Sequence, residues 1–93
     1  MGESFTATAA SDSMEPTIRV MQEIRILRVP FDDIQTNDII AYVVRKRRKI
    51  IVHRVVDVRQ VNGQRVVITK GDKFMVPDTY RVRLSNFIGK VLV

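Results

Sequence analysis

The dipeptide Asn62-Gly63 stands between two runs rich in valine and isoleucine, and it constrains the fold of this chain more than any other short segment. A two-residue β-hairpin of type I′ needs positive φ at both central positions, which asparagine and glycine adopt at low cost. The β-branched residues on either side favour extended strands. The sequence therefore predicts a β-hairpin that turns at Asn62-Gly63.

A two-residue turn also fixes which residues pair across the hairpin, because each step back from the turn is matched by one step forward. The predicted pairs are Val61 with Gln64, Val58 with Val67, Val56 with Thr69, and Val55 with Lys70. The ninth residue back is His53 and the ninth forward is Asp72, so an unbroken hairpin places them on one face with Cβ atoms roughly 4.5–5.5 Å apart. A β-bulge would shift this register, and Gly71 is a plausible position for one.

The rest of the chain repeats the pattern of short apolar runs separated by turn residues, without sustained helical periodicity. Predicted strands are Glu23–Val29, Asp38–Val44, Ile50–Val58, Gln64–Lys70, Tyr80–Leu84 and Phe87–Val93, with a short extended piece before Ser11. We therefore expect a single all-β domain over residues 1–93, a small coiled β-barrel or β-sandwich of mostly antiparallel strands. Residues 1–10 would form an extended N-terminal segment.

Composition excludes several classes of protein. With no cysteine, a disulfide framework is ruled out. With one histidine as well, only carboxylates remain for a metal site, so we expect no metal. No run approaches the ~20 apolar residues of a membrane helix, and we expect no transmembrane anchor in this chain.

The net charge is +6, from sixteen basic and ten acidic residues, and five of the basic residues form the run Arg45–Lys49. The simplest interpretation of this run is a solvated hairpin tip. The functional alternatives are attraction to anionic lipid headgroups or to nucleic acid. No aromatic residue interrupts the run, which argues against a base-stacking platform and therefore against nucleic acid.

Three residues together have the chemistry of an activated nucleophile. A serine hydroxyl such as that of Ser13 needs a base to take its proton, and His53 is the only histidine. Asp72 would orient that histidine if the predicted hairpin is unbroken. Taken singly, Ser13 is as readily the cap of a short helical turn at Pro16, and His53 a packing residue in an apolar strand.

Several blocks of the sequence resemble the type I signal peptidases, in the Ser/His branch of endoplasmic-reticulum, archaeal and some Gram-positive enzymes. The blocks are Ser13–Ile18, Asp38–Tyr42, Ile51–Val56, Ile68–Asp72 and, more weakly, Ile88–Val91. The resemblance implies the signal-peptidase catalytic-core fold and a serine endopeptidase that removes signal peptides, with small residues before the cut, from exported preproteins. It also implies a membrane-associated protein whose catalytic domain lies on the extracytoplasmic side, with no cofactor.

Matched position by position, the resemblance implies that Ser13 is the nucleophile, His53 the general base and Asp72 the acid that orients it. Asp78 matches a second aspartate of this branch and is the reserve for that role. The hydroxyl of Ser11 and the backbone N–H of Ser13 would hold the oxyanion.

The base is the point at which this family divides. Its bacterial housekeeping branch has lysine where this chain has His53. Lys49 and Lys70 flank the predicted site in the sequence, but neither matches the position of that lysine.

The chain departs from the family at Asp12, where glycine is usual, and at Gln22-Glu23, where Gly-Asp is common. A carboxylate at Asp12 would repel a developing oxyanion unless it turned to solvent.

Two other functions therefore stay open. One is a self-cleaving, repressor-like member of the superfamily, and the other is a non-catalytic module whose basic run binds anionic lipid or nucleic acid.

Overall fold

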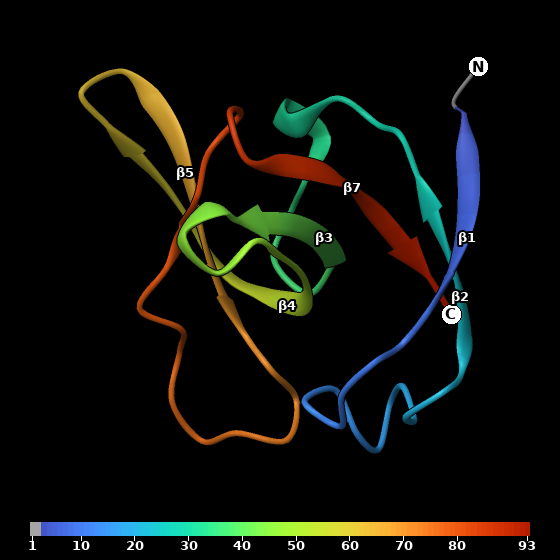
Figure 1. Cartoon of the computed structure of the whole chain (residues 1–93). Helices are drawn as coiled ribbons and strands as arrows, with labels where there is room; N and C mark the ends of the chain where they lie inside the picture. Colours follow the sequence, from blue (N-terminus) through green and yellow to red (C-terminus); the bar gives the residue numbers. More distant parts are fainter. Residues whose placement is uncertain (1–2) are drawn as a thin grey trace.

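A computed structural model describes residues 3–93, which form seven strands and two three-residue 3-10 turns (Figure 1). In chain order these are β1 (Ser4–Thr8), β2 (Glu23–Leu27), η1 (Phe31–Asp33), β3 (Ile39–Val44), η2 (Arg45–Arg47), β4 (Lys49–Val61), β5 (Gln64–Lys70), β6 (Arg81–Val82) and β7 (Phe87–Leu92). The all-β fold class is confirmed, and each predicted strand is present with ends that differ by a few residues. The extended piece before Ser11 is β1; residues 1 and 2 of the expected N-terminal segment lie outside the described residues.

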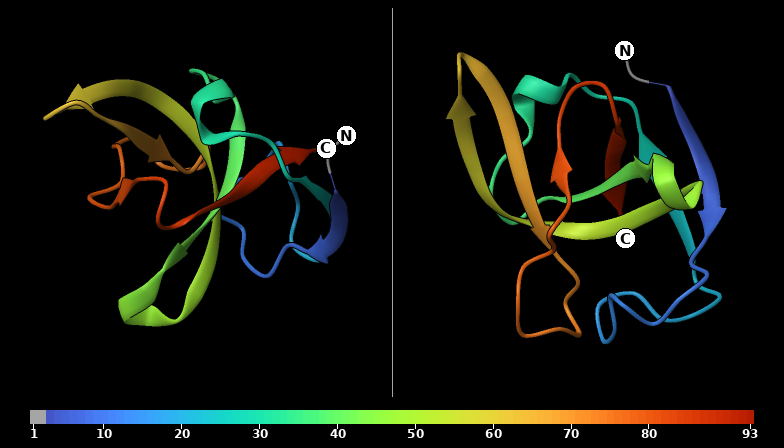
Figure 2. Two further views of the ribbon diagram at one scale, coloured as in Figure 1. Left: turned by 90° about the horizontal axis from the view of Figure 1, so that it is seen from above. Right: turned by 60° about the vertical axis from the view of Figure 1, so that its left-hand side comes forward.

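The strands form one antiparallel sheet in the order β1-β2-β7-β3-β4-β5-β6. Figure 2 shows that this sheet coils strongly, so that the ends of the strand order curl away from the middle. Strand β3 lies at the centre and is buried on both faces, which explains its continuous apolar sequence.

Successive residues of β3 point to opposite faces of the sheet and so contribute to two separate cores. One face has Ile40, Tyr42 and Val44 packed with Phe31, Ile34, Val55, Val67 and Val82. The other has Ile39 and Ala41 packed with Met14, Ile18, Ile24, Ile26 and Val91. The second core fixes Met14, and through it the position of Ser13 beside the sheet.

The β4–β5 hairpin turns where predicted. Asn62 and Gly63 have φ of 52° and 77°, and Val61 lies opposite Gln64. The register is lost nearer the site, because a bulge between Val55 and Asp57 leaves an extra residue on β4.

Beyond this bulge Val55 pairs with Thr69, and Arg54 pairs with Lys70. The predicted pairs Val56 with Thr69 and Val55 with Lys70 are therefore wrong, and so is the placement of His53 opposite Asp72 that the same count gave. The bulge is not at Gly71, the position expected to accommodate one. The shift of one residue turns the side chains of β4 to the other face relative to β5.

The basic run forms the tip of the β3–β4 hairpin, where η2 is followed by Arg48 in the left-handed conformation. All five side chains of Arg45–Lys49 are exposed. Within residues 3–93, no helical segment is long and apolar enough to cross a membrane.

Candidate active site

Ser13 lies in an irregular turn between β1 and β2. The amide of Glu15 donates to the carbonyl of Asp12 at 3.0 Å, and the amide of Ile18 donates to the carbonyl of Met14 at 3.0 Å. The side chains of Met14 and Ile18 are buried, so the turn is pinned to the sheet on both sides of its bend. No regular helix begins here, and the Ser13 hydroxyl is directed at another segment of the chain.

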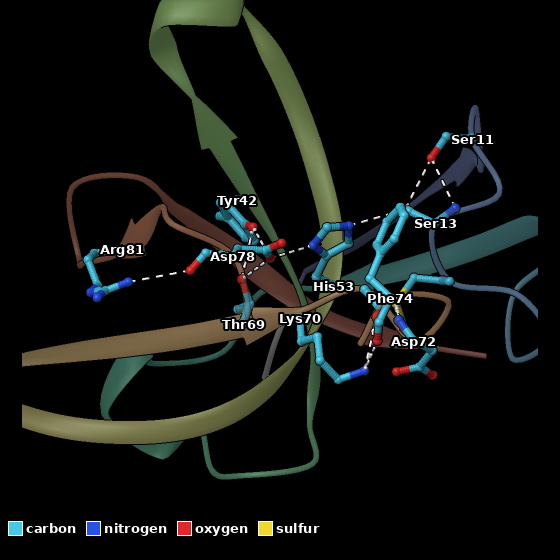
Figure 3. Close-up of polar contacts among 12 residues, drawn as sticks. Ser11, Ser13, Tyr42, His53, Thr69, Lys70, Asp72, Phe74, Asp78 and Arg81 are labelled. Atoms are coloured by element: carbon cyan, nitrogen blue, oxygen red, sulfur yellow. Dashed lines mark hydrogen bonds and ion pairs between the residues drawn. The ribbon is translucent and has the colours of Figure 1, made fainter. Parts of the chain in front are cut away.

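That segment is β4. His53 Nε2 lies 3.1 Å from Ser13 Oγ, and His53 Nδ1 lies 2.5 Å from Asp78 Oδ2 (Figure 3). The His53 side chain is only 11% exposed, so it has little competition from water. With the proton on Nδ1, the ring donates to Asp78 and its Nε2 accepts from Ser13. This arrangement of an alcohol, an imidazole and a carboxylate is the one that Ser-His-Asp hydrolases use.

Asp78 is held by a buried network under the histidine. Thr69 Oγ1 donates to Asp78 Oδ2 at 2.7 Å, and the Tyr42 hydroxyl lies 2.9 Å from Thr69 Oγ1 and 3.3 Å from Asp78 Oδ2. The amide of Asp78 donates to the Thr69 carbonyl at 2.8 Å, which returns the loop after β5 to the sheet. Thr69 and Tyr42 are fully buried.

The ionisation of Asp78 reflects these contacts. Burial raises the pKa of its carboxyl, but the hydrogen bonds from His53, Thr69 and Tyr42 act in the opposite direction, and the net pKa lies below its ordinary value. Burial also raises the pKa of the Tyr42 phenol far above its usual range, so this hydroxyl keeps its proton. Asp78 is therefore an anion at neutral pH and a steady acceptor for the Nδ1 proton.

Asp72 has different partners. Its carboxylate accepts two hydrogen bonds from Arg54, at 2.9 Å from Nε and 2.8 Å from Nη2, and one from Thr17 Oγ1 at 2.6 Å. The Arg54 hydrogen bond is the largest influence on Asp72 and lowers the pKa of its carboxyl. Asp72 thus joins β4 to the turn that bears Ser13, and it is Asp78 that contacts His53.

Gly71 allows these segments to approach one another. A Cβ atom here would lie 2.7 Å from the Ser13 carbonyl oxygen, 2.9 Å from Phe74 Cδ2 and 3.1 Å from His53 Nε2. The Ser13 carbonyl is also fixed by the amide of Lys73, which donates to it at 3.1 Å. Only glycine fits between the serine and the histidine without displacing one of them.

The two expected oxyanion donors lie together. Ser11 Oγ is 3.1 Å from Ser13 Oγ, and the Ser13 amide points at Ser11 Oγ over a long 3.4 Å contact. Asp12, between them, directs its carboxylate to the ammonium of Lys73, which lowers the pKa of Asp12 and raises that of Lys73. Its φ is not positive, so an aspartate at this position causes no backbone strain of that kind. The expected repulsion of the oxyanion is therefore offset by Lys73.

The lysines near the site have other partners. Lys70 Nζ donates to the carbonyls of Phe74 at 2.7 Å and Gly71 at 3.2 Å. Lys49 begins β4 and lies four residues from His53, or ~13 Å along an extended strand. Within residues 3–93, His53 is the basic side chain that contacts Ser13.

Sequence reasoning missed four residues that support the site: Thr17, Tyr42, Arg54 and Thr69. Arg54 gave the clearest signal, as a charge in the middle of an apolar strand next to the histidine. Thr69 lies inside a block that carried the family resemblance. No family model, curated protein or solved structure matches this chain.

Proposed function

We propose that this protein is a serine endopeptidase of the signal-peptidase type. The observation that carries the proposal is the continuous contact from Ser13 Oγ through His53 to Asp78, over 3.1 Å and 2.5 Å. The substrates are exported preproteins cut after small residues, as the family resemblance implies, and the enzyme acts on the extracytoplasmic side of a membrane.

The chemistry follows from the positions of the three side chains. Ser13 Oγ forms a bond to the scissile carbonyl carbon while His53 Nε2 takes its proton. The developing oxyanion accepts from the Ser13 amide and the Ser11 hydroxyl, replacing their weak mutual contact. The C–N bond then breaks, and His53 returns the proton to the leaving amine. Water, activated by the same imidazole, hydrolyses the acyl-enzyme. Asp78 stays ionised throughout and holds the imidazolium.

Strand β4 offers main-chain groups for an extended substrate. The Val43 amide donates to the Asn86 carbonyl on the β7 side, so Val43 and its partner Ile50 do not exchange hydrogen bonds. The amide and carbonyl of Ile50 therefore point to the outer edge of β4, as do those of Val52 two residues later. Strand β5 covers this edge only from Arg54 onward. The edge leading to His53 is open within the described part of the chain.

A second open edge lies before the serine. Ala9 exchanges main-chain hydrogen bonds with Met21 and Gln22, so the groups of Thr8 and Ala10 point away from β2. Strand β1 is the last strand of the sheet on this side. The first edge reaches Val52, next to His53, and the second reaches Ala10, three residues before Ser13, and the two side chains are in contact. This supports a peptide substrate that adds itself as a strand and presents its carbonyl to Ser13.

The test is cleavage of a signal-peptide substrate with an Ala-X-Ala sequence by the wild type, Ser13→Ala and His53→Ala. Both variants should lose cleavage while remaining folded, as measured by their thermal unfolding. Undiminished cleavage by Ser13→Ala would refute the proposal. Loss of mass from the chain itself in the absence of peptide would assign the activity to self-cleavage.

A further inference from the structure

The fold brings a second basic segment to the tip of the β3–β4 hairpin. Arg81 and Arg83, thirty-odd residues further along the chain, lie beside Arg45 and Lys46 around a hollow of about 300 Å³. Tyr80 and Ser85 also line this hollow. We call the seven cations of the two segments the basic surface: Arg45, Lys46, Arg47, Arg48, Lys49, Arg81 and Arg83.

The basic surface accounts for the whole net positive charge of the protein. Of its sixteen basic residues, the other nine are outnumbered by the ten acidic residues. The ion pairs of residues 3–93 all lie elsewhere, at His53, Arg54, Arg59, Lys73 and Lys90. Like charges gathered without counter-charges repel one another, and an anion bound among them removes that repulsion.

Specific contacts hold the two segments together. Arg45 Nη2 donates to the Ser85 carbonyl at 2.9 Å, and the Arg47 guanidinium lies over the Tyr80 ring at 5.6 Å from its centre. These contacts fix the tip against the residues on both sides of β6, so the hollow is a feature of the fold rather than of a free loop. The left view of Figure 2 shows the tip projecting from the body of the protein.

A larger hollow of about 770 Å³ adjoins the basic one and shares Arg83 and Ser85 with it. Pro30, Phe31 and Leu84 give it an apolar wall, with Asp32, Gln64 and Arg65 completing the lining. Leu84 is 74% exposed, directly between two residues that line both hollows. A cationic hollow and an apolar one therefore lie side by side.

We infer that the basic surface binds an anionic phospholipid at a membrane surface, with the headgroup phosphate among Arg45, Arg81 and Arg83 and an acyl chain against Leu84. Guanidinium groups match phosphate geometry, and an amphiphile fills both hollows at once. Nucleic acid is less well matched, because Arg47 covers the one aromatic ring that lines the basic hollow. The inference is independent of the proposed catalysis.

The test is sedimentation of the Ser13→Ala protein with phosphatidylcholine vesicles, with and without phosphatidylglycerol. Binding should need the anionic lipid and weaken as salt is raised. The double variant Arg81→Gln/Arg83→Gln, which leaves the sequence run intact, should bind about 30-fold more weakly, from the usual contribution per basic residue at a membrane surface. Arg25→Gln/Arg28→Gln, which loses the same charge from exposed positions of β2 and the residue after it, should bind as the parent does.

Other outcomes would overturn the inference. Equal binding by the two double variants would mean that only net charge matters. Unchanged binding by Leu84→Ser would show that no acyl chain packs against Leu84. Displacement from vesicles by dilute inorganic phosphate would assign the hollow to a free anion, and tighter binding to a duplex oligonucleotide would assign the surface to nucleic acid. Thermal unfolding of each variant confirms that it is folded.

Discussion

Replacing Gly71 by alanine tests how closely the serine and the histidine must approach. The new methyl group would meet the Ser13 carbonyl oxygen at 2.7 Å and His53 Nε2 at 3.1 Å. Both lie inside ordinary van der Waals contact, so one of the segments must retreat by several tenths of an ångström. The Ser13 carbonyl cannot swing aside freely, because the Lys73 amide binds it at 3.1 Å.

A displacement of this size has a definite cost for catalysis. A misplacement of about 1 Å at a reacting group lowers rates by about 100-fold. We therefore expect Gly71→Ala to lower kcat/KM for an Ala-X-Ala peptide by about 10- to 100-fold. Crowding of a packed site should also reduce the free energy of unfolding by about 1–3 kcal/mol.

Gly63→Ala is a control variant, because its expected loss of stability is similar to that of Gly71→Ala. Gly63 has φ of 77° with no atom within 4 Å of the added methyl group, so the cost is backbone strain of about 1–2 kcal/mol. Gly63 lies in the turn beyond the end of β4, ten residues from His53 in the sequence. Peptide cleavage by Gly63→Ala should therefore be unchanged. Peptide cleavage and urea unfolding of both variants give the comparison. Wild-type kcat/KM in Gly71→Ala would refute the reasoning.

Three further predictions concern the carboxylates and the open strand edge. Asp78→Asn should lower kcat about 10³–10⁴-fold, because the amide does not stabilise the imidazolium as the carboxylate does. Asp72→Asn should mainly lower the free energy of unfolding, by about 1–2 kcal/mol. An equal loss of kcat in both variants would contradict these assignments. The folded-state pKa of Asp72 is lowered, so its stabilisation is complete above the ordinary carboxyl pKa near 4 and is lost as pH falls through the lower folded value. The difference between wild type and Asp72→Asn in urea unfolding should therefore shrink below about pH 4, and a constant difference down to pH 2 would speak against the Arg54 pairing. Ile50→Pro removes an outward-pointing amide and should raise KM without unfolding the protein, whereas Ile51→Pro should unfold it; an unchanged KM in Ile50→Pro would exclude this edge from substrate binding.

Local chemistry was sufficient to predict most of the fold. β-Branched runs specify strands, and Asn62-Gly63 specifies a turn, because each depends on conformational preferences of neighbouring residues. The register of the hairpin was correct from the turn to Asp57 for the same reason.

The bulge near Val56 could not be predicted in this way. Val56 carries no turn signal, and a bulge is set by how both faces of the sheet pack. Its effect on the site is large, because with the shifted register the carboxylate of Asp72 binds Arg54 and does not lie opposite His53. The return of the loop after β5, which brings Asp78 to the histidine, depends on a main-chain contact with Thr69 that leaves no pattern in the sequence. Ser13 was selected because it begins the block Ser13–Ile18 that carries the family resemblance, and His53 because it is the only histidine in the sequence.

The central claim is that His53 activates Ser13, and the rate of acylation by a fluorophosphonate probe measures this most directly. Mass spectrometry should find a single adduct, on Ser13, formed about 10²–10⁴ times more slowly in His53→Ala. An adduct on another residue, or the same rate of labelling without the imidazole, would contradict the account.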